Sequence, residues 1–579
     1  MRLQKAARYL GVLAISLIWG QAELYAREAK QETKLDGLES RLGQLLMLGF
    51  IGSECTPQLQ KLIRTNKPSS LILFSRNIKT PRQTLKMLEC AQATAKKAGI
   101  PPLLIAVDQE GGNVIRIKQT PPMPSALALA RTQDPEFARR IAYATGQLMR
   151  ALGINTNLAP VVDVSDPETD EFIGTRSYGG SPETVARFAV AFAQGLQQAQ
   201  ILPVAKHFPG HGDASGDSHL GFAENQSTLE QLKARDLQPY AQLQEKLTQP
   251  WAVMLAHVAF PKVDPSKRPA SFSTKLVQDL LRKDLRLPGL VITDDIQMLG
   301  ASKTLSLGER AVEALKAGSD LVMVSYAPKA QLDIITAIRR ALQSGELSRE
   351  RVREALGRIE AAQAVYAQAV PRPKEQPEQV LRLALKNPEF QLISDGVLQT
   401  LLRQHQSGRS PATSRWIELQ SHDPIFVLTP RTLFADQVRR GFKARGSQRN
   451  IRFLRLDATQ RATNLRSFRA SPESPIIVYA SGKGPAAELK NYPEEFRARM
   501  RVINVESRAA LKGVRDFFEI IEVNYRHPQL GELIASHFIE PTRAEASTPV
   551  RLENSRRSLA NVPNQGEGPS ASRPSPTSP

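Results

Sequence analysis

The sequence predicts an α/β protein in which a (β/α)8 TIM-type barrel is followed by a smaller α/β sandwich domain. Eight short apolar runs alternate with longer stretches of helical periodicity between residues 45 and 326. Continuous apolar runs are typical of parallel strands covered on both faces, because neither face meets water. Eight strand and helix units in about 320 residues fit a barrel, which places an active site at the carboxyl ends of the strands.

The eight runs are the expected barrel strands, and helix starts fall between them. The runs are Leu45–Ile51, Ser70–Ser75, Leu103–Asp108, Thr156–Val164, Leu202–His207, Ala252–Phe260, Gly289–Asp294 and Asp320–Ser325. A capping side chain before a proline predicts helices at Asp134-Pro135 and Ser181-Pro182. Capping-box spacing, with Glu three residues after Ser, predicts two more at Ser227 and Ser306.

A second α/β unit is expected after the barrel. The proline-rich polar segment 371–379 has the composition of an exposed linker between a catalytic domain at 35–370 and a sandwich domain at 380–540. Five apolar runs separated by helical patterns support the second domain: Pro424–Leu428, Ile451–Leu456, Pro475–Tyr479, Met500–Val505 and Phe518–Val523. Residues 541–579 are rich in Ser, Pro, Asn and Arg, and we expect a disordered tail there.

Composition excludes several classes of protein. The 579 residues are 41% hydrophobic and 23% charged, as in an ordinary globular chain, which excludes wholesale disorder and fibrous structure. Only Cys55 and Cys90 are present, so neither a disulfide-stapled miniprotein nor a thiolate zinc site can form. The sequence leaves open whether these two cysteines pair.

The N-terminus predicts export. Residues 1–9 carry three basic side chains, Leu10–Gly20 is apolar, and a candidate cleavage site with small residues follows near Ala26. This is the pattern of a cleavable signal peptide over residues 1–26, and its apolar core is too short for a bilayer span, which needs about 20 residues. The alternatives are an uncleaved amphipathic anchor or a helix packed on the domain. We expect a periplasmic or secreted protein without a transmembrane segment.

The chain is strongly basic, with 77 Lys and Arg against 57 Asp and Glu, a formal charge of +20. Residues 371–540 hold 27 basic and 18 acidic side chains, so this part carries much of the excess. No helix-turn-helix, RNA-recognition or zinc-finger pattern is present, so the sequence does not predict nucleic-acid binding. An anionic envelope surface is a simpler partner for an exported basic protein, and a well-solvated basic surface without a partner is the alternative.

Five of the expected strands end on polar or ionisable side chains. They are Asp108, Asp163, Lys206-His207, His257 and Asp294-Asp295. A charge at the end of a buried strand needs a partner or a ligand. Stabilising ion pairs at the rim of the barrel would explain one or two of these residues. Because strand ends converge at one face of a barrel, all five together indicate a site for a polar ligand with many hydroxyl groups.

The segment KHFPGHGDASGDSH, from Lys206 to His219, is expected to be an irregular loop after the fifth strand. His207 and His211 have the i, i+4 spacing of metal ligands, but the proline and glycines around them prevent the helix that would align both imidazoles. We therefore expect no metal site. Asp217 lies two residues before His219 and can orient that imidazole, which makes His219 a candidate general acid and base.

Six motifs along Leu35–Tyr366 closely resemble glycoside hydrolase family 3, in particular its bacterial β-N-acetylglucosaminidases. The motifs are KHFPGHGDASGDSH, AVDQEGGNVIR, LILFSRN, IGTRSYGG, NLAPVVDV and VITDDIQM. The resemblance implies a barrel fold, Asp294 as the nucleophile, and Asp217 with His219 as the acid/base pair. It also implies substrate contacts at Asp108, Arg116, Arg176, Lys206 and His207, and no cofactor.

These residue types suit a retaining glycosidase, in which a carboxylate and a proton donor lie on opposite sides of the anomeric carbon. Asp295 is the rival nucleophile, but neighbouring strand side chains point to opposite faces, so one of the two faces the pocket. The resemblance selects Asp294. The expected substrate is a peptidoglycan fragment or related amino-sugar oligosaccharide. A glycoside phosphorylase using the same site, and a non-catalytic wall-binding protein, are the alternatives.

Overall fold

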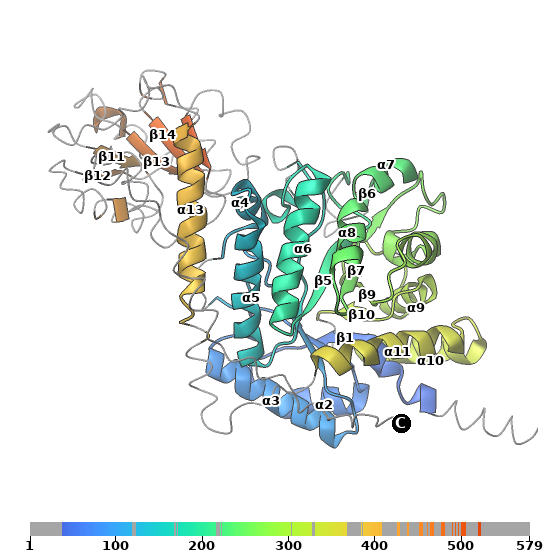
Figure 1. Cartoon of the computed structure of the whole chain (residues 1–579). Coiled ribbons are helices and arrows are strands. Elements are labelled where there is room, and N and C mark those ends of the chain that lie inside the picture. Colours follow the sequence, from blue (N-terminus) through green and yellow to red (C-terminus); the bar gives the residue numbers. More distant parts are fainter. Residues whose placement is uncertain are drawn as a thin grey trace, which may run out of the picture.

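The computed structural model (Figure 1) describes residues 37–367, apart from 119–122, 167–169, 171, 216–220, 222, 303 and 327–329. Beyond them it describes Ala384, residues 386–407 and separate short segments between residues 425 and 522. The predicted signal peptide 1–26, linker 371–379 and tail 541–579 lie outside the described residues. The predicted domain limits therefore stay predictions.

Eight parallel strands form a barrel. They are β1 (Leu46–Gly49), β2 (Ser70–Leu73), β3 (Leu104–Val107), β4 (Thr156–Asn157), β5 (Leu202–Phe208), β7 (Ala252–Leu255), β9 (Leu290–Thr293) and β10 (Val322–Val324). Their order is β10-β1-β2-β3-β4-β5-β7-β9. A parallel bridge between Ile292 and Leu321 joins the two end strands. Each strand begins within two residues of the start of one of the eight predicted runs, so the predicted barrel is confirmed. Strands β4 and β7 end seven and five residues before their runs do.

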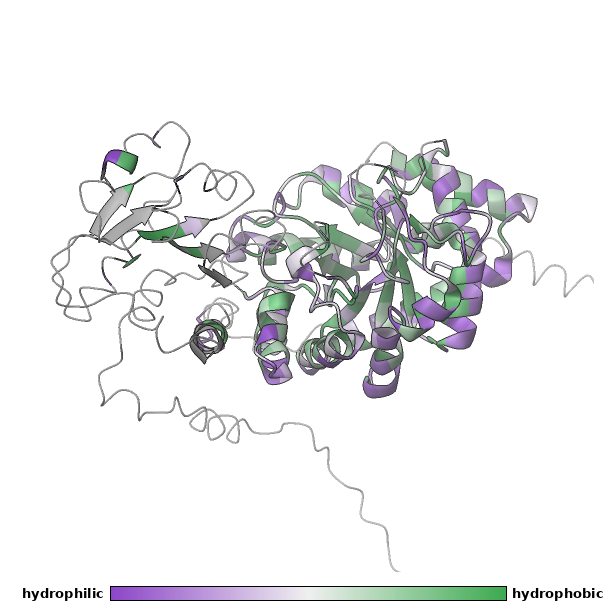
Figure 2. Cartoon of the chain, turned by 90° about the horizontal axis from the view of Figure 1, so that it is seen from above, coloured by the Kyte–Doolittle hydropathy of each residue, from purple (hydrophilic) through white to green (hydrophobic). Residues whose placement is uncertain are grey.

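Helices cover the outside of the barrel (Figure 2), and their apolar sides face the green strands at the centre. They are α2 (Pro57–Asn66), α3 (Pro81–Lys97), α4 (Ala126–Arg131), α5 (Pro135–Leu152), α6 (Pro182–Gln198), α7 (Leu229–Ala234), α8 (Gln238–Lys246), the π-helix η4 (Lys275–Asp284), α9 (Leu307–Ala317), α10 (Ala330–Ser344) and α11 (Arg349–Tyr366). Short 3-10 turns are η1 (Leu42–Leu45), η2 (Gly174–Arg176) and η3 (Ala270–Phe272), and a small parallel pair joins β6 (Ala223–Glu224) to β8 (Val258–Ala259).

Three of the four predicted helix caps are confirmed, and one is wrong by a residue. Asp134, Ser181 and Ser306 each accept a backbone N–H of the first turn. Helix α7 is instead capped by Thr228, which forms a capping box with Gln231. Ser227 lies in the turn before the helix because its N–H donates to Oδ1 of Asn225, at 2.8 Å.

A second parallel sheet follows, in the order β12-β11-β13-β14-β15. Its strands are β11 (Ile425–Leu428), β12 (Ile451–Leu454), β13 (Ile476–Ala480), β14 (Met500–Asn504) and β15 (Glu519–Glu522), one in each of the five runs predicted beyond residue 420. Helix α13 (Glu389–Ser407) runs beside α5 (Figure 1), where Glu389 accepts two hydrogen bonds from Arg140, at 2.8 and 2.9 Å. Phe390 and Val397 of α13 belong to the same buried apolar cluster as the strands and helices of the barrel.

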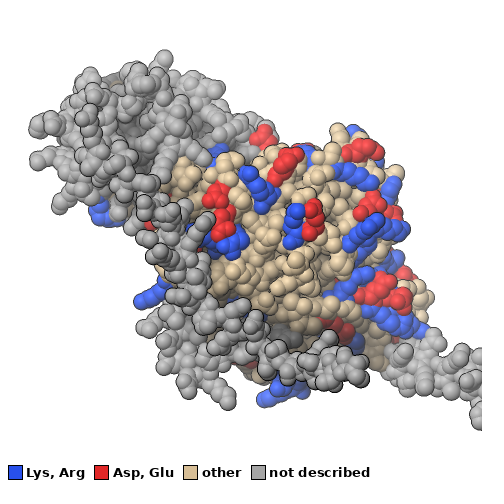
Figure 3. Space-filling model, viewed as in Figure 1, with Lys and Arg blue, Asp and Glu red and all other residues tan. Residues whose placement is uncertain are grey.

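The described surface carries charges of both signs. On the face in Figure 3, Lys and Arg side chains lie among Asp and Glu side chains, so this face is not a basic patch. Among the described helices, none combines the length and apolar character that a bilayer crossing requires.

Cys55 and Cys90, whose pairing the sequence left open, form a disulfide that links the loop before α2 to α3. The bond closes a loop with a sequence separation of 35 residues. In the chain-entropy account, cross-linking restricts the unfolded chain and stabilises the folded one.

Replacing both cysteines by alanine is expected to lower the free energy of unfolding of the barrel by about 3 to 4 kcal/mol, the entropy cost of a loop of this length. Urea unfolding with and without dithiothreitol measures the effect. The reductant should bring the wild-type midpoint down to that of the double variant and leave the variant unchanged. A wild-type midpoint that does not respond to reduction would contradict the pairing.

Candidate active site

A compact group of charged side chains, here called the strand-end cluster, lies at the carboxyl ends of β3 to β5. Its members are Asp108, Glu110, Arg116, Arg176 and Lys206. Nζ of the buried Lys206 is 2.8 Å from Oδ1 of Asp108 and 2.7 Å from Oε1 of Glu110. Arg176 donates to both oxygens of Glu110, each at 2.9 Å. NH2 of Arg116 is 3.8 Å from Oδ2 of Asp108.

The two buried partners at the centre of this cluster are both ionised. Burial would raise the pKa of Glu110, but Arg176 and Lys206 together lower it by more than burial raises it, so the net shift is downward. Burial would lower the pKa of Lys206, but Asp108 and Glu110 raise it. Three cations therefore face two carboxylates, and the cluster keeps donors and acceptors available for a hydroxyl-rich ligand.

His207 is fixed by a buried carboxylate. Its Nδ1 is 2.7 Å from Oδ2 of Asp163, whose other oxygen accepts the backbone N–H groups of His207 and His211. Burial would raise the pKa of Asp163, but His207 lowers it more, so the net shift is downward. Because this carboxylate accepts the Nδ1 proton, Nε2 is the nitrogen of His207 that can serve a ligand.

Asp294 and Asp295, directly after β9, have different surroundings. Oδ1 of Asp295 accepts the backbone N–H groups of Gln297 and Ser325, at 3.1 and 3.3 Å, and its Oδ2 accepts the Ser325 hydroxyl. Oδ1 of Asp294 accepts the N–H of Asp295, at 2.7 Å. From the side chains and amides that the structure describes, Oδ2 of Asp294 accepts no hydrogen bond. Asp295 is therefore a structural link to β10, and Asp294 has a carboxylate oxygen available.

The electrostatic environments of the two carboxyl groups also differ, and they shift the two pKa values in opposite directions. Burial would raise the pKa of Asp294, but His207, His257, the Asp295 amide and Lys206 lower it, so its net pKa is below the ordinary value. Burial raises the pKa of Asp295 despite its hydrogen bonds from Ser325 and Gln297, and the charge of Asp294 raises it further. Asp294 is the group held as a carboxylate.

The side chains of His257 and His211 contact other parts of the protein and have structural roles. Nδ1 of His257 pairs with the Ser271 hydroxyl at 2.8 Å, and its Nε2 with the carbonyl of Asp295 at 3.1 Å, so His257 fixes the end of β9. The ring of His211 stacks on Phe172 with centroids 4.4 Å apart. Burial and the neighbouring His207 lower the pKa of His211 to about 4. Among the described residues, no group of three potential ligands could hold a metal ion.

Most of the predicted site residues therefore lie together. Asp108, Arg116, Arg176, Lys206 and His207 form the strand-end cluster and its border, and Asp294 interacts electrostatically with Lys206 and His207. Asp217 and His219 lie outside the described residues. The base of their loop is closed by the N–H of Ser215, which donates to the carbonyl of Glu224 at 2.8 Å.

Glu110 was missed as a functional residue from the sequence. It is 9% exposed and contacts two cations that were predicted to bind substrate, Arg176 and Lys206. The available signal was the second acidic residue in AVDQEGG, which supplies the carboxylate that two buried cations require.

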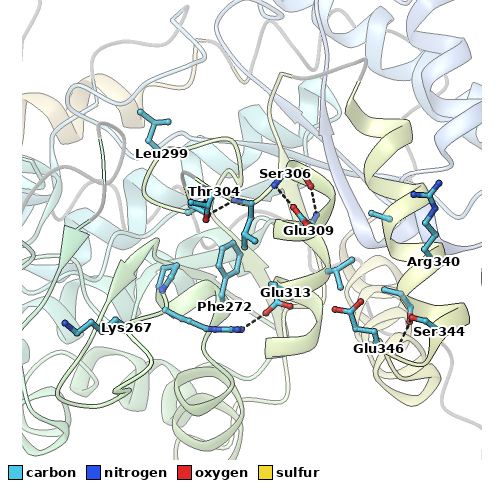
Figure 4. Close-up of a pocket in the computed structure, with 18 residues that line it drawn as sticks. Lys267, Phe272, Leu299, Thr304, Ser306, Glu309, Glu313, Arg340, Ser344 and Glu346 are labelled. Atoms are coloured by element: carbon cyan, nitrogen blue, oxygen red, sulfur yellow. Dashed lines mark hydrogen bonds and ion pairs between the residues drawn. The ribbon is translucent and has the colours of Figure 1, made fainter.

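A separate surface pocket of about 970 Å³ lies between η3, the β9–α9 loop, α9 and α10 (Figure 4). Phe272 and Leu299 are among its apolar side chains, and an ion pair between Arg268 and Glu313 crosses one side. None of the described residues that line it belongs to the strand-end cluster. The pocket is thus distinct from the group around Asp294.

Asp236 is a buried carboxyl under the loop that follows β5. It is 1% exposed, and a Cβ atom at position 210 would lie 2.7 Å from its Oδ1, so only glycine fits there. No described residue donates a hydrogen bond to that oxygen. Burial raises the pKa of Asp236 to about 7 against the opposing charge of Arg235, and the charge of Asp163 raises it further.

Replacing Asp236 by Asn is expected to stabilise the protein at pH 8 but not at pH 4. The folded-state pKa lies above that of an unfolded chain, so the contribution of Asp236 to stability is full below about pH 4. It falls as the pH rises through 7, by up to about 4 kcal/mol, and an amide cannot ionise. Thermal melting of both proteins at the two pH values measures the difference. The matched control is Asp213→Asn, an exposed carboxylate paired with Arg235. An equal gain from Asp236→Asn at both pH values would contradict the account.

Comparison with known proteins gives the family of the barrel. The family model described as Glycosyl hydrolase family 3 N terminal domain matches residues 37–362. A Beta-hexosaminidase of Idiomarina loihiensis is 38% identical over 284 residues, which are 48% of this chain and 83% of that protein.

Two solved structures extend the comparison. A glycoside hydrolase family 3 beta-N-acetylglucosaminidase from Paenibacillus sp. matches with a TM-score of 0.72 and 29% identity, covering 86% of this chain and 95% of that one. NagZ from Neisseria gonorrhoeae, in complex with N-trifluoroacetyl-D-glucosamine, matches with a TM-score of 0.50 and 27% identity, covering 62% of this chain and 97% of that one. The barrel, the strand-end cluster and these matches show that the chain belongs to glycosyl hydrolase family 3.

Proposed function

We propose that the protein is an exported, retaining exo-β-N-acetylglucosaminidase that removes terminal β-linked N-acetylglucosamine from peptidoglycan fragments or related amino-sugar oligosaccharides. The observation that carries the proposal is the contrast between Asp294 and Asp295. One is held as a carboxylate beside His207 and Lys206, and the other is bonded to Ser325. The names of the relatives, beta-hexosaminidase and beta-N-acetylglucosaminidase, support the amino-sugar substrate.

In the first step, an oxygen of Asp294 attacks the anomeric carbon, the bond from that carbon to the leaving oxygen breaks, and His219 gives its proton to the leaving oxygen. The product is a glycosyl ester on Asp294. In the second step, His219 takes a proton from water, the water oxygen attacks the anomeric carbon, and the ester bond breaks to regenerate Asp294. Asp217 orients His219 in both steps.

The strand-end cluster would bind the hydroxyl groups of the terminal sugar. Asp108 accepts from hydroxyls, while Lys206, Arg116 and Arg176 donate to them. Glu110 neutralises part of the charge and holds Lys206 and Arg176 in place. A buried site of this kind rejects a sugar that lacks a matching hydroxyl, because its polar groups would be left without partners.

Export to the periplasm or the medium rests on the signal pattern of residues 1–26 and on the Cys55–Cys90 disulfide. Disulfides persist mainly in oxidising compartments, and those lie outside the cytoplasm in most bacteria. The basic excess of residues 371–540 suits attachment to an anionic envelope surface, which would keep the enzyme near its substrate.

A panel of p-nitrophenyl β-glycosides tests the activity, with and without inorganic phosphate. Hydrolysis of the N-acetylglucosaminide, well above that of the glucoside and galactoside and independent of phosphate, is the expected result. Accumulation of N-acetylglucosamine 1-phosphate in the phosphate arm would identify a phosphorylase instead. Absence of turnover on every glycoside would contradict the proposed function.

A further inference from the structure

Two large apolar side chains are strongly exposed just after barrel strands, at the carboxyl-end face where the charged cluster lies. They are Ile51 after β1 and Tyr326 after β10, which are 59% and 55% exposed. Exposed apolar groups that border a polar site are typical of ligand-binding surfaces. Tyr326 is the aromatic one of the two, and an aromatic face can stack against the apolar face of a sugar ring.

The backbone of Tyr326 is tied to the segment that carries the proposed nucleophile. Its N–H donates to Oε1 of Gln297, at 2.7 Å. The N–H of Gln297 in turn donates to the carboxylate of Asp295, which also accepts the N–H of Ser325. Gln297 thus links the backbone of Tyr326 to Asp295, the residue next to Asp294.

Arg76 braces the ring of Tyr326. Its guanidinium carbon is 4.3 Å from the ring centroid of Phe74 and 5.8 Å from that of Tyr326. The same guanidinium donates to the carbonyls of Phe50, at 3.2 Å, and Ser325, at 2.7 Å. An arginine fixed at several points orients an aromatic ring through its π face and limits the entropy that the ring loses when a ligand binds.

The order of the strands gives the direction in which a substrate leaves the site. The charged cluster lies at the ends of β3, β4 and β5, whereas Asp294 follows β9. Around an eight-stranded ring, β9 and β10 stand across from β3 and β4. A sugar whose hydroxyls face the cluster has its anomeric carbon on the side of β9 and β10. The leaving group then lies on this side of the barrel mouth, on the face of the ring opposite to Asp294, and Tyr326 is the exposed aromatic side chain there.

We propose that Tyr326 is the stacking platform for the leaving-group sugar, so that it sets the preference of the enzyme for oligosaccharides over simple glycosides. The proposal rests on the proposed function, because it needs Asp294 at the anomeric carbon. Arg76 acts as a positioning residue that holds the platform.

The test compares two substrates that share the terminal sugar and differ in the leaving group. N,N′-diacetylchitobiose has a second sugar that can reach Tyr326, and N-acetyl-β-glucosaminyl fluoride has a leaving group too small to do so. Tyr326→Ala is expected to lower kcat/KM for the disaccharide about tenfold and to change that for the fluoride less than twofold. Tyr326→Phe, which keeps the ring, should retain both values.

Leu332→Ala is the matched control, since Leu332 is 50% exposed on α10 and belongs to no part of the site. It should leave both substrates unaffected. Equal losses on both substrates in Tyr326→Ala, or no loss on the disaccharide, would overturn the platform while leaving the proposed function intact. If the wild-type enzyme hydrolysed neither substrate, the proposed function itself would fail, and the platform with it.

Discussion

Asp294→Asn is expected to lower kcat on p-nitrophenyl N-acetyl-β-glucosaminide by about 10⁴-fold or more, the scale seen when a member of a covalent catalytic unit is removed. An amide has no charge to stabilise the developing positive charge at the anomeric carbon and is a poor nucleophile. Oδ1 of Asp294 accepts only the Asp295 N–H among the described groups, and an amide oxygen can keep that bond. The folded state should therefore survive.

Asp295→Asn is the matched control for this variant. Asp295 accepts bonds from Ser325 and Gln297 with both oxygens, and an amide can accept with only one of them. The control should therefore show a lower melting temperature than Asp294→Asn and a much smaller loss of kcat. Full activity in Asp294→Asn, or a larger loss of kcat in the control, would reverse the assignment of the nucleophile.

His219→Ala is expected to lower kcat/KM by about 10² to 10⁴-fold for substrates whose leaving group must be protonated, the range typical of general acid catalysis. The loss should be far smaller for a 2,4-dinitrophenyl glycoside, because its leaving group departs without a proton. The basic limb of the pH profile, which reports loss of the acid's proton, should disappear. Measuring kcat/KM against leaving-group pKa for both proteins tests this.

Asp217→Asn is the companion variant, because it keeps the shape of the side chain and removes the charge that orients His219. It should show the same dependence on the leaving group with a smaller loss. An equal loss on good and poor leaving groups in His219→Ala would instead indicate a binding or folding role for His219.

The barrel could be predicted from the sequence because its strands are covered on both faces and are therefore continuously apolar. The same property locates the carboxyl ends of the strands, where any charged residue must have a partner or a ligand. This is why Asp108, Lys206 and Asp294 could be selected before their contacts were known. Asp217 and His219 were selected by their spacing and by family resemblance, and their roles are proposals.

Other features depend on contacts between residues distant in the sequence, which no local pattern records. Glu110 is important because Arg176 and Lys206 meet at its carboxylate, and these cations come from different strand–helix units. The disulfide depends on α2 and α3 lying side by side. The cap of α7 moved by one residue because Thr228 fits the same pattern as Ser227 and an Asn225 turn already uses the N–H of Ser227.

Mass spectrometry of a trapped intermediate tests whether Asp294 is the residue that forms the glycosyl ester. The protein would be incubated with a 5-fluoro derivative of N-acetylglucosaminyl fluoride, which forms the glycosyl ester faster than water can hydrolyse it, and then digested. One added fluoro-sugar is expected on the peptide that contains Asp294, localised to that residue by fragmentation. An adduct on Asp295 or another residue, or turnover with inversion of the anomeric centre and no adduct, would contradict this assignment.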